Sequence, residues 1–204
     1  THSIRVVFLT DVHLREYGMD NGDLVEDIEN LFPDLILLGG DLVNDTVDSY
    51  DNMISLCSQL TEIAPVCGVL GNHEDVKIYH QGDEELVKRF EDAGVKILRN
   101  EETSYSLYDN TVSVIGIEGK PEDFASYGAK ECMEAQEAED QYDLRMCLLI
   151  SRRSWEITAL TLDLQDIPTA ELSVCRSWAL FILRKRDCSR SMEEVSIPLT
   201  TRRR

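Results

Sequence analysis

Short apolar runs separated by helical patterns constrain the fold of this chain most. Four such runs are rich in Val, Ile and Leu and end in turn residues, over 4–9, 34–38, 65–70 and 95–98. Three stretches between them carry apolar residues at helical spacing, over 23–31, 46–63 and 83–93. Strands that alternate with helices predict an α/β fold with a largely parallel sheet covered on both faces.

Two further strands and a helix are predicted before residue 143. Strands over 105–107 and 112–117 flank Asp109 and Asn110, which indicates a hairpin. The acidic stretch 122–139 is predicted to be helical. After residue 144 the apolar residues follow no sustained period, so no element is predicted there.

Composition divides the chain into two kinds of sequence. Residues 1–143 have a net charge of −23, whereas residues 144–204 have a net charge of +4. All 11 glycines lie at or before Gly128, and all four histidines lie within the first 80 residues. We therefore expect a domain over 1–143, followed by a tail of different origin.

Charge and cysteine spacing exclude several function classes. The whole chain of 204 residues carries a net charge of −19, which repels nucleic acid phosphates. The six cysteines include no C-x-x-C pair, so neither a zinc knuckle nor a disulfide framework is indicated. No run of 18 apolar residues occurs, so no membrane span is predicted.

Polar, chemistry-bearing residues follow the first three predicted strands directly. The first strand ends in Asp11-Val12-His13, the second in Gly40-Asp41, and the third in Gly71-Asn72-His73-Glu74. The carboxyl ends of parallel strands lie along one edge of a sheet. We therefore expect these side chains to converge despite their separation in sequence.

The converging groups suit a metal centre. Carboxylate, imidazole and amide oxygens together bind divalent ions such as Mn, Fe, Co or Zn. A central carboxylate can bridge two ions, which clamp a phosphoryl group and generate a nucleophile at neutral pH. The glycines Gly40 and Gly71 let the backbone turn sharply and let a phosphate approach. Each piece alone is common in loops; the ordered set directly after buried strands is the informative signal.

The ordered motifs D-x-H, G-D and G-N-H-[DE] resemble the opening signature of calcineurin-like metallophosphoesterases. The resemblance covers roughly residues 4–117 and is strongest to small bacterial enzymes that begin T-D-[IV]-H-L, as Thr10 to Leu14 do here. Those enzymes are often membrane-associated, and some cleave UDP-diacylglucosamine or other phosphodiesters and phosphomonoesters. The resemblance implies a metallophosphoesterase-type β-sandwich flanked by helices.

The resemblance also implies roles for single residues. Asp11 and His13 bind the first of two metal ions, Asp41 bridges both, and Asn72 binds the second. His73 lies over the phosphate and assists the leaving group as a general acid. Glu74 supports the ligands by orienting a histidine.

The second half of the family's site is absent from this sequence. The family requires a later histidine after a strand and then a G-H-x-H motif, whereas no histidine follows His80 here. If the ligand pattern of the family applies, one ion has three protein ligands in this chain and the other has two. These are too few for a stable binuclear centre. We therefore expect hydrolysis by this chain to be impaired.

A shift of reading frame near residues 143–148 accounts for the missing motifs. Residues 165–171 can be encoded by CAG-GAC-ATA-CCC-ACG-GCG-GAG, and grouping each last nucleotide with the next two gives Gly-His-Thr-His-Gly-Gly. The same shift over 187–197 can give Leu-Phe-Pro-Glu-Tyr-Gly-Gly-Gly-Lys-Tyr, and over 149–153 His-Gln-Pro-Glu. Our hypothesis is that residues 144–204 are an out-of-frame translation of the same domain. The alternative is a divergent or unrelated C-terminal segment.

Two other function classes stay open: a non-catalytic relative that binds metal or a partner, and a frameshift product without a selected role. The expected partner is a small phosphorylated substrate. The expected location is the cytoplasm or the periphery of a bacterial membrane, through an anchor upstream of Thr1. The sequence predicts neither the substrate nor the oligomeric state.

Overall fold

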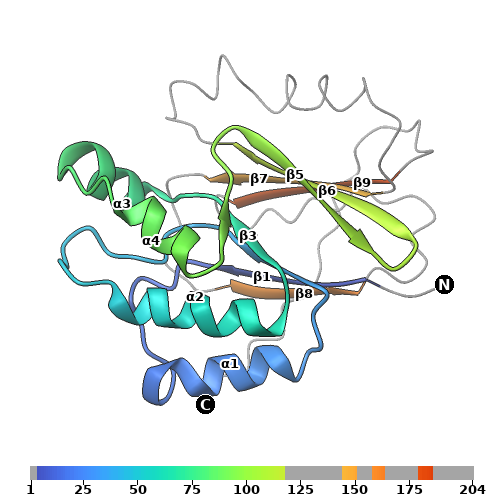
Figure 1. The fold of residues 1–204 in the computed structure, drawn as a ribbon, viewed down its shortest axis with the longest axis horizontal. Coiled ribbons are helices and arrows are strands. Elements are labelled where there is room, and N and C mark those ends of the chain that lie inside the picture. Colours follow the sequence, from blue (N-terminus) through green and yellow to red (C-terminus); the bar gives the residue numbers. More distant parts are fainter. Residues whose placement is uncertain (1–3, 118–143, 151–157, 164–178, 186–204) are drawn as a thin grey trace.

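Two β-sheets and a layer of helices make up the described part of the chain (Figure 1). The computed structural model describes residues 4–117, 144–150, 158–163 and 179–185. Helices α1 and α2 lie on one side of the first sheet, and the second sheet lies on its other side. This arrangement confirms the α/β sandwich with flanking helices.

The first sheet carries the candidate site and has five strands in the order β4-β3-β2-β1-β8. Their bounds are Lys96–Ile97 for β4, Val66–Gly68 for β3, Leu35–Leu38 for β2, Arg5–Thr10 for β1 and Thr158–Asp163 for β8. Strands β1 to β4 run parallel, as predicted, with Val6 beside Leu35 and Leu9 beside Leu38. Strand β8 is antiparallel to β1.

The second sheet has four strands in the order β5-β6-β7-β9. Their bounds are Glu101–Leu107, Asn110–Ile117, Leu144–Ile150 and Ala179–Lys185. Strands β5 and β6 form the predicted antiparallel hairpin. Strand β7 is parallel to β6, and β9 is antiparallel to β7.

The helical segments connect the parallel strands. Their bounds are Met19–Asn21 for η1, Gly22–Glu29 for α1, Asp51–Ile63 for α2, Asn72–Asp75 for α3, Val76–His80 for the π-helical turn η2, and Leu86–Asp92 for α4. Helix α2 begins five residues after its predicted start at Thr46. The Asn44 side chain accepts from the Thr46 backbone N–H at 3.0 Å, which favours a turn there over a helix.

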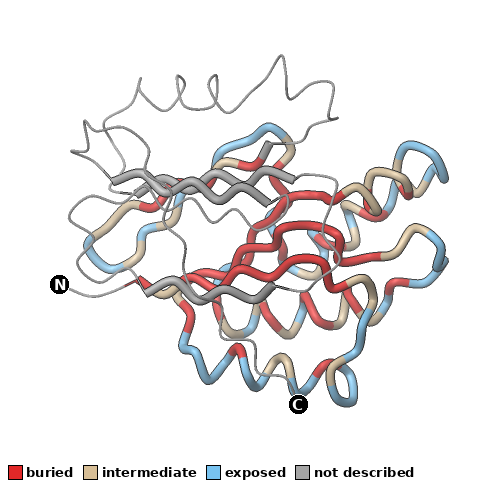
Figure 2. Tube along the Cα trace, turned by 180° about the vertical axis from the view of Figure 1, so that it is seen from behind, coloured by how far each residue is buried: buried red, intermediate tan, exposed pale blue. Residues whose placement is uncertain are grey.

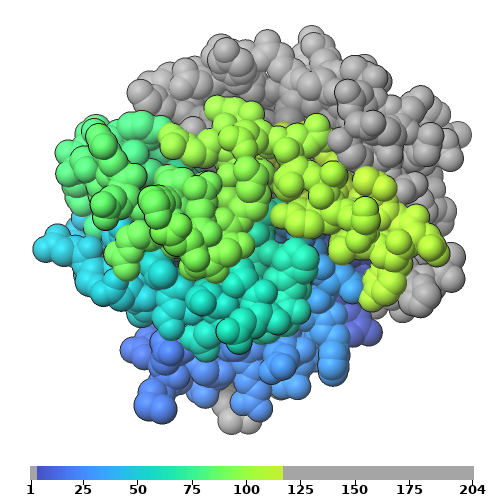
Figure 3. Space-filling model, viewed as in Figure 1, coloured from blue at the N-terminus to red at the C-terminus, as the bar shows by residue number. Residues whose placement is uncertain are grey.

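The main core lies between the first sheet and helices α1, α2 and α4. Burial is concentrated in the parallel strands and on the helix faces turned toward them (Figure 2). The fully buried residues include Leu9, Ile36, Leu38, Met53, Leu56, Leu60 and Phe90. The space-filling view shows the segments of α1, α2 and α3 to β6 stacked in chain order, from blue to yellow-green (Figure 3). Because the parallel strands and helices α1, α2 and α4 bury a common core, the loops at the strand ends rest on a rigid support.

Residues after 143 supply three strands that the sequence did not predict: β7, β8 and β9. Pairing of β8 with β1 joins residues more than 140 positions apart, and local periodicity carries no signal for such pairing. The helix predicted over 122–139 lies outside the described residues. Among the residues that the structure describes, no helix has the length and apolar character needed to cross a membrane.

Candidate metal centre

Three loops at the carboxyl ends of β1, β2 and β3 bring together the residues that the sequence singled out. Asp11 and His13 follow β1, Asp41 follows β2, and His73 lies in the short helix α3 after β3. Helical connections return the chain to the start of each next parallel strand. The ends of β1, β2 and β3 therefore lie at the same edge of the sheet, and residues as far apart as Asp11 and His73 meet there. This convergence is what the parallel order of β1 to β3 requires.

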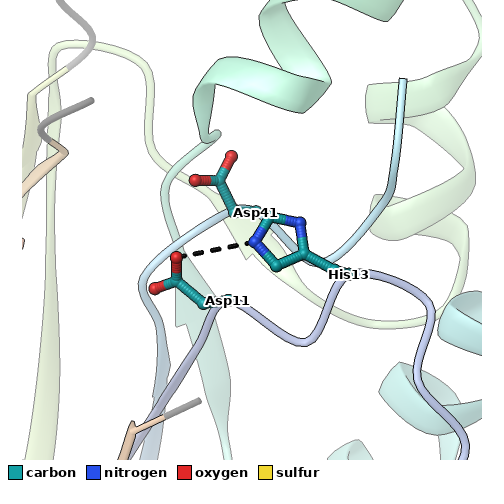
Figure 4. A group of neighbouring side chains, drawn as sticks. All are labelled: Asp11, His13 and Asp41. Carbon is teal, nitrogen blue, oxygen red and sulfur yellow. Dashed lines mark ion pairs between the residues drawn. The ribbon is translucent and has the colours of Figure 1, made fainter. Parts of the chain in front are cut away.

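Asp11, His13 and Asp41 form a compact cluster of donor atoms. One ligand atom from each lies within 4.8 Å of the others, and in the described part of the chain they are the sole group of three or more such residues this close. The His13 Nε2 atom lies 3.6 Å from Asp11 Oδ1, and Figure 4 shows the Asp41 carboxylate beside this pair. Both carboxylates are buried, while the imidazole is half-buried. The cluster therefore presents two carboxylates and one imidazole to a single small space.

All three donors sit on backbone in the left-handed region. The φ angles are 57° for Asp11, 50° for His13 and 52° for Asp41, a conformation that residues other than glycine seldom adopt. The preceding Gly40 has φ 84°, so the turn before Asp41 is one that glycine favours. Strained backbone of this kind persists where surrounding contacts hold it, and it concentrates at functional sites.

Backbone hydrogen bonds hold the first two loops together beyond the end of the β1–β2 pairing. The Asp11 N–H donates to the Gly40 carbonyl at 3.1 Å, and the His13 N–H donates to the Asp41 carbonyl at 3.0 Å. Next, the Leu14 N–H donates to the Leu42 carbonyl at 2.9 Å. These hydrogen bonds therefore join the backbones of the two donor-bearing loops into one unit.

The electrostatics of the cluster favour a cation. Burial raises the pKa of Asp11, and the negative charge of Asp41 raises it further, while a hydrogen bond from Thr10 and the nearby His13 oppose the shift. Two buried carboxylates beside each other repel, and a divalent cation relieves this repulsion. The residues present therefore fit a divalent ion such as Mn, Fe, Co or Zn.

His73 lies against this cluster and is oriented by a residue that sequence reasoning missed. Its ring meets that of His13 edge to face, with 4.7 Å between the ring centroids. Its Nδ1 atom lies 2.6 Å from Asp45 Oδ1. Asp45 stands four residues after Asp41 in the same loop, so an acidic residue shortly after the G-D motif was the available signal.

Asn72 and Gly71 lie directly against Asp41. With its nitrogen turned toward Asp41, the Asn72 amide donates to Oδ2 at 3.2 Å. The His73 backbone N–H donates to Asp41 Oδ1 at 3.1 Å. A Cβ atom at Gly71 would lie 2.2 Å from Asp41 Oδ1, so only glycine fits there. The structure thus brings Asn72 to the cluster, and its binding of a second ion stays a prediction.

Glu74 contacts backbone amides, whereas the sequence led us to expect that it orients a histidine. The carboxylate is buried and accepts from the N–H groups of Asp41 at 2.9 Å, Val43 at 2.9 Å and Gly71 at 2.7 Å. Burial raises the pKa of Glu74 to about 7, the charge of Asp41 adds to this rise, and the three backbone hydrogen bonds oppose it. Glu74 belongs to the short helix α3, and its hydrogen bonds go to backbone amides of the loops after β2 and β3.

Comparison with known proteins identifies a family to which most of the chain is similar. The sequence model of the calcineurin-like phosphoesterase family matches residues 4–158, which extends into the segment after 143. The chain is 27% identical to the uncharacterized protein YpbG of Bacillus subtilis over 115 residues, 56% of this chain and 42% of that protein. It is 28% identical to an uncharacterized metallophosphoesterase of Helicobacter pylori over 102 residues, 48% of this chain and 26% of that protein.

The chain therefore spans less than half the length of these two relatives. Among solved structures, the NAD nucleotidase of Haemophilus influenzae matches with a TM-score of 0.41 and 14% identity, covering 59% of this chain and 27% of that one. The family match covers most of the chain and includes all three loops of the site. The chain belongs to the calcineurin-like phosphoesterase family, whose members are metal-dependent hydrolases.

Proposed function

We propose that this domain is a phosphoester hydrolase built for a binuclear metal centre, of which it retains the first half. The observation that carries the proposal is the convergence of Asp11, His13 and Asp41 within 4.8 Å at the ends of β1 and β2. A buried cluster of this composition is suited to a divalent ion rather than to a side-chain ion pair. Phosphomonoesters and phosphodiesters are the substrate classes that such centres hydrolyse.

The residues of the site take distinct roles in this proposal. Asp11, His13 and Asp41 would hold the first ion, and Asp41 together with Asn72 would hold a second. A divalent ion, when bound, supplies a nucleophile at neutral pH and neutralises the charge of the phosphoryl group. His73 delivers a proton to the leaving group as a general acid. Asp45 holds the His73 ring in position through the 2.6 Å contact at Nδ1.

A second ion would find too few protein ligands in this chain, so we propose that turnover is impaired. No histidine follows His80 in the sequence, whereas the family supplies three more from its later strands and loops. We expect one ion to bind at Asp11, His13 and Asp41, and the second to bind weakly. A non-catalytic, metal-binding relative is the second candidate, and the same absence of histidines favours it.

The segment 144–204 is proposed to be out-of-frame translation of the remaining domain. The support is the recovery of three family segments by one shift, including Gly-His-Thr-His-Gly-Gly over residues 165–171. The coding DNA tests this directly, because the third base of each codon is then known. Codons that regroup to other residues at 165–171 contradict the hypothesis and favour a divergent segment.

The substrate is proposed to be a small phosphorylated molecule. A net charge of −19 disfavours nucleic acid as a partner, because its phosphates would be repelled before reaching the site. A location in the cytoplasm or at the membrane periphery accords with such a substrate. Hydrolysis of an aryl phosphomonoester and an aryl phosphodiester separates the two ester classes.

Isothermal titration calorimetry of the purified chain with Mn²⁺ tests the metal site. We expect one tight ion per chain and loss of binding in Asp11→Asn. The matched control is Asp109→Asn, which removes an exposed carboxylate from the β5–β6 hairpin. Turnover of p-nitrophenyl phosphate or its bis ester then distinguishes the candidates: metal binding without turnover favours the non-catalytic relative. Equal Mn²⁺ binding in Asp11→Asn and the parent chain would contradict the site.

A further inference from the structure

The Glu74 carboxylate bridges two separate loops through backbone amides alone. One of its oxygens, Oε2, accepts from Asp41 N–H at 2.9 Å and from Gly71 N–H at 2.7 Å. The other, Oε1, accepts from Val43 N–H at 2.9 Å. Asp41 and Val43 belong to the loop after β2, and Gly71 belongs to the loop after β3.

We propose that Glu74 is a positioning residue that fastens the loop after β2 to the loop after β3, and so sets where Asp41 stands relative to His73. The side chain is 1% exposed, so water does not compete for its oxygens. In its ionised form this carboxylate makes charge-assisted hydrogen bonds, which are about twice as strong as neutral ones. A reciprocal bond completes the connection, since the His73 N–H donates to Asp41 Oδ1 at 3.1 Å.

The three loops are thereby linked in series. The loop after β1 donates its amides to carbonyls of the loop after β2, at Gly40, Asp41 and Leu42. The loop after β2 in turn donates amides to Glu74 on the far side. Asp41 is the central member, because its carbonyl serves the first loop and its N–H serves the third. Loss of the hydrogen bonds to Glu74 is therefore expected to make Asp41 more mobile, while the hydrogen bonds between the loops after β1 and β2 remain.

This proposal rests on the metal site proposed above, so its test reads both the loops and the ion. Glu74→Gln keeps the size of the side chain but turns an N–H₂ group toward one set of donors, so at least one of the three hydrogen bonds is lost. Leu60→Ala is the matched control: Leu60 is fully buried in the last turn of α2, at the opposite end of the helix from the site. Truncation of a buried leucine to alanine weakens the core without removing a contact of the loops.

Two measurements decide the proposal. Amide hydrogen exchange in the metal-free protein should be at least about tenfold faster at Asp41, Val43 and Gly71 in Glu74→Gln, with Ile36 as an internal reference in β2. The dissociation constant for Mn²⁺ should rise about 10–100-fold in Glu74→Gln and stay unchanged in Leu60→Ala. Equal exchange at the three amides in both proteins overturns the positioning role. Failure of the parent chain to bind Mn²⁺ overturns the proposed function, and the exchange result then decides the role of Glu74 by itself.

Discussion

The Nδ1 atom of His73 lies 2.6 Å from Oδ1 of Asp45, so the neutral imidazole carries its proton at Nδ1, and Nε2 is the nitrogen that would take up and deliver the proton of general-acid catalysis. The Asp45 backbone N–H also approaches Nδ1, at 3.4 Å, but the contact to the carboxylate is much shorter and decides the tautomer. Asp45→Asn should remove this preference and shift the ring toward the Nε2–H form. Two-bond ¹H–¹⁵N correlation spectra of the neutral ring report the tautomer directly.

The control for this prediction is Asp48→Asn, which removes an exposed carboxylate from the same loop. Its spectrum should match that of the parent protein. Where turnover is measurable, Asp45→Asn should also lower it by about 10–100-fold, the usual cost of losing a residue that orients a functional histidine. An unchanged tautomer in Asp45→Asn would show that the carboxylate does not orient the ring.

Removal of bound metal should lower the thermal stability of the chain. An ion present at about 100 times its dissociation constant stabilises the folded state by about 2.7 kcal/mol. For a chain of this size that corresponds to roughly 5–10 °C in Tm. Differential scanning fluorimetry with Mn²⁺ and then with excess EDTA should show this difference, and Asp41→Asn should abolish it. A metal-dependent shift that survives Asp41→Asn would place the ion elsewhere.

Gly71→Ala should damage both stability and metal binding. The added Cβ would lie 2.2 Å from Asp41 Oδ1 and 2.3 Å from the Asp41 backbone nitrogen, so Asp41 must move. Forced overpacking costs about 1–3 kcal/mol, and displacement of Asp41 removes a ligand. Gly22→Ala is the control, because nothing lies within 4 Å of its Cβ position and its φ of −54° suits alanine. Urea denaturation and Mn²⁺ calorimetry on both variants check the prediction.

Phe32→Gly should stabilise the fold. Phe32 follows the end of α1 with φ 51° and is 71% exposed, so its ring contributes little packing to offset the left-handed backbone. Relief of about 1–2 kcal/mol of strain exceeds the roughly 0.5–1 kcal/mol that glycine loses in chain entropy. Met19→Gly is the contrasting variant: Met19 is 92% exposed without a positive φ, and its replacement should lower stability. Chemical denaturation that ranks the two variants in the opposite order would contradict this account.

The first half of the chain could be predicted from its sequence because the relevant signals are local. Buried strands such as Ile36 to Leu38 stand between turn residues, and the motif residues come directly after them. Their convergence then follows from the geometry of parallel strands. The prediction that Asp11, His13 and Asp41 meet in space is confirmed by their donor distances.

The parts of the fold and of the site that the sequence did not predict depend on contacts between residues far apart in the chain. Strand β8 finds its place by pairing with β1, and nothing in residues 158–163 alone indicates that partner. The role of Asp45 depends on a ring that reaches it from residue 73, and the role of Glu74 depends on backbone amides that have no sequence signature. Side-chain chemistry predicted which residues belong to the site. The backbone hydrogen bonds that hold those residues in place could not be predicted from the sequence.

The series of hydrogen bonds from the loop after β1 to Glu74 has a consequence for how the chain is made. Every donor and acceptor in that series lies at or before residue 74, so the framework of the centre is complete in the nascent chain long before residue 143 is added. Residues 158–163 are added later and pair with β1 along the edge that β2 does not occupy. A change of reading frame after residue 143 would therefore leave the first half of the centre with its own scaffold, assembled and without its counterpart.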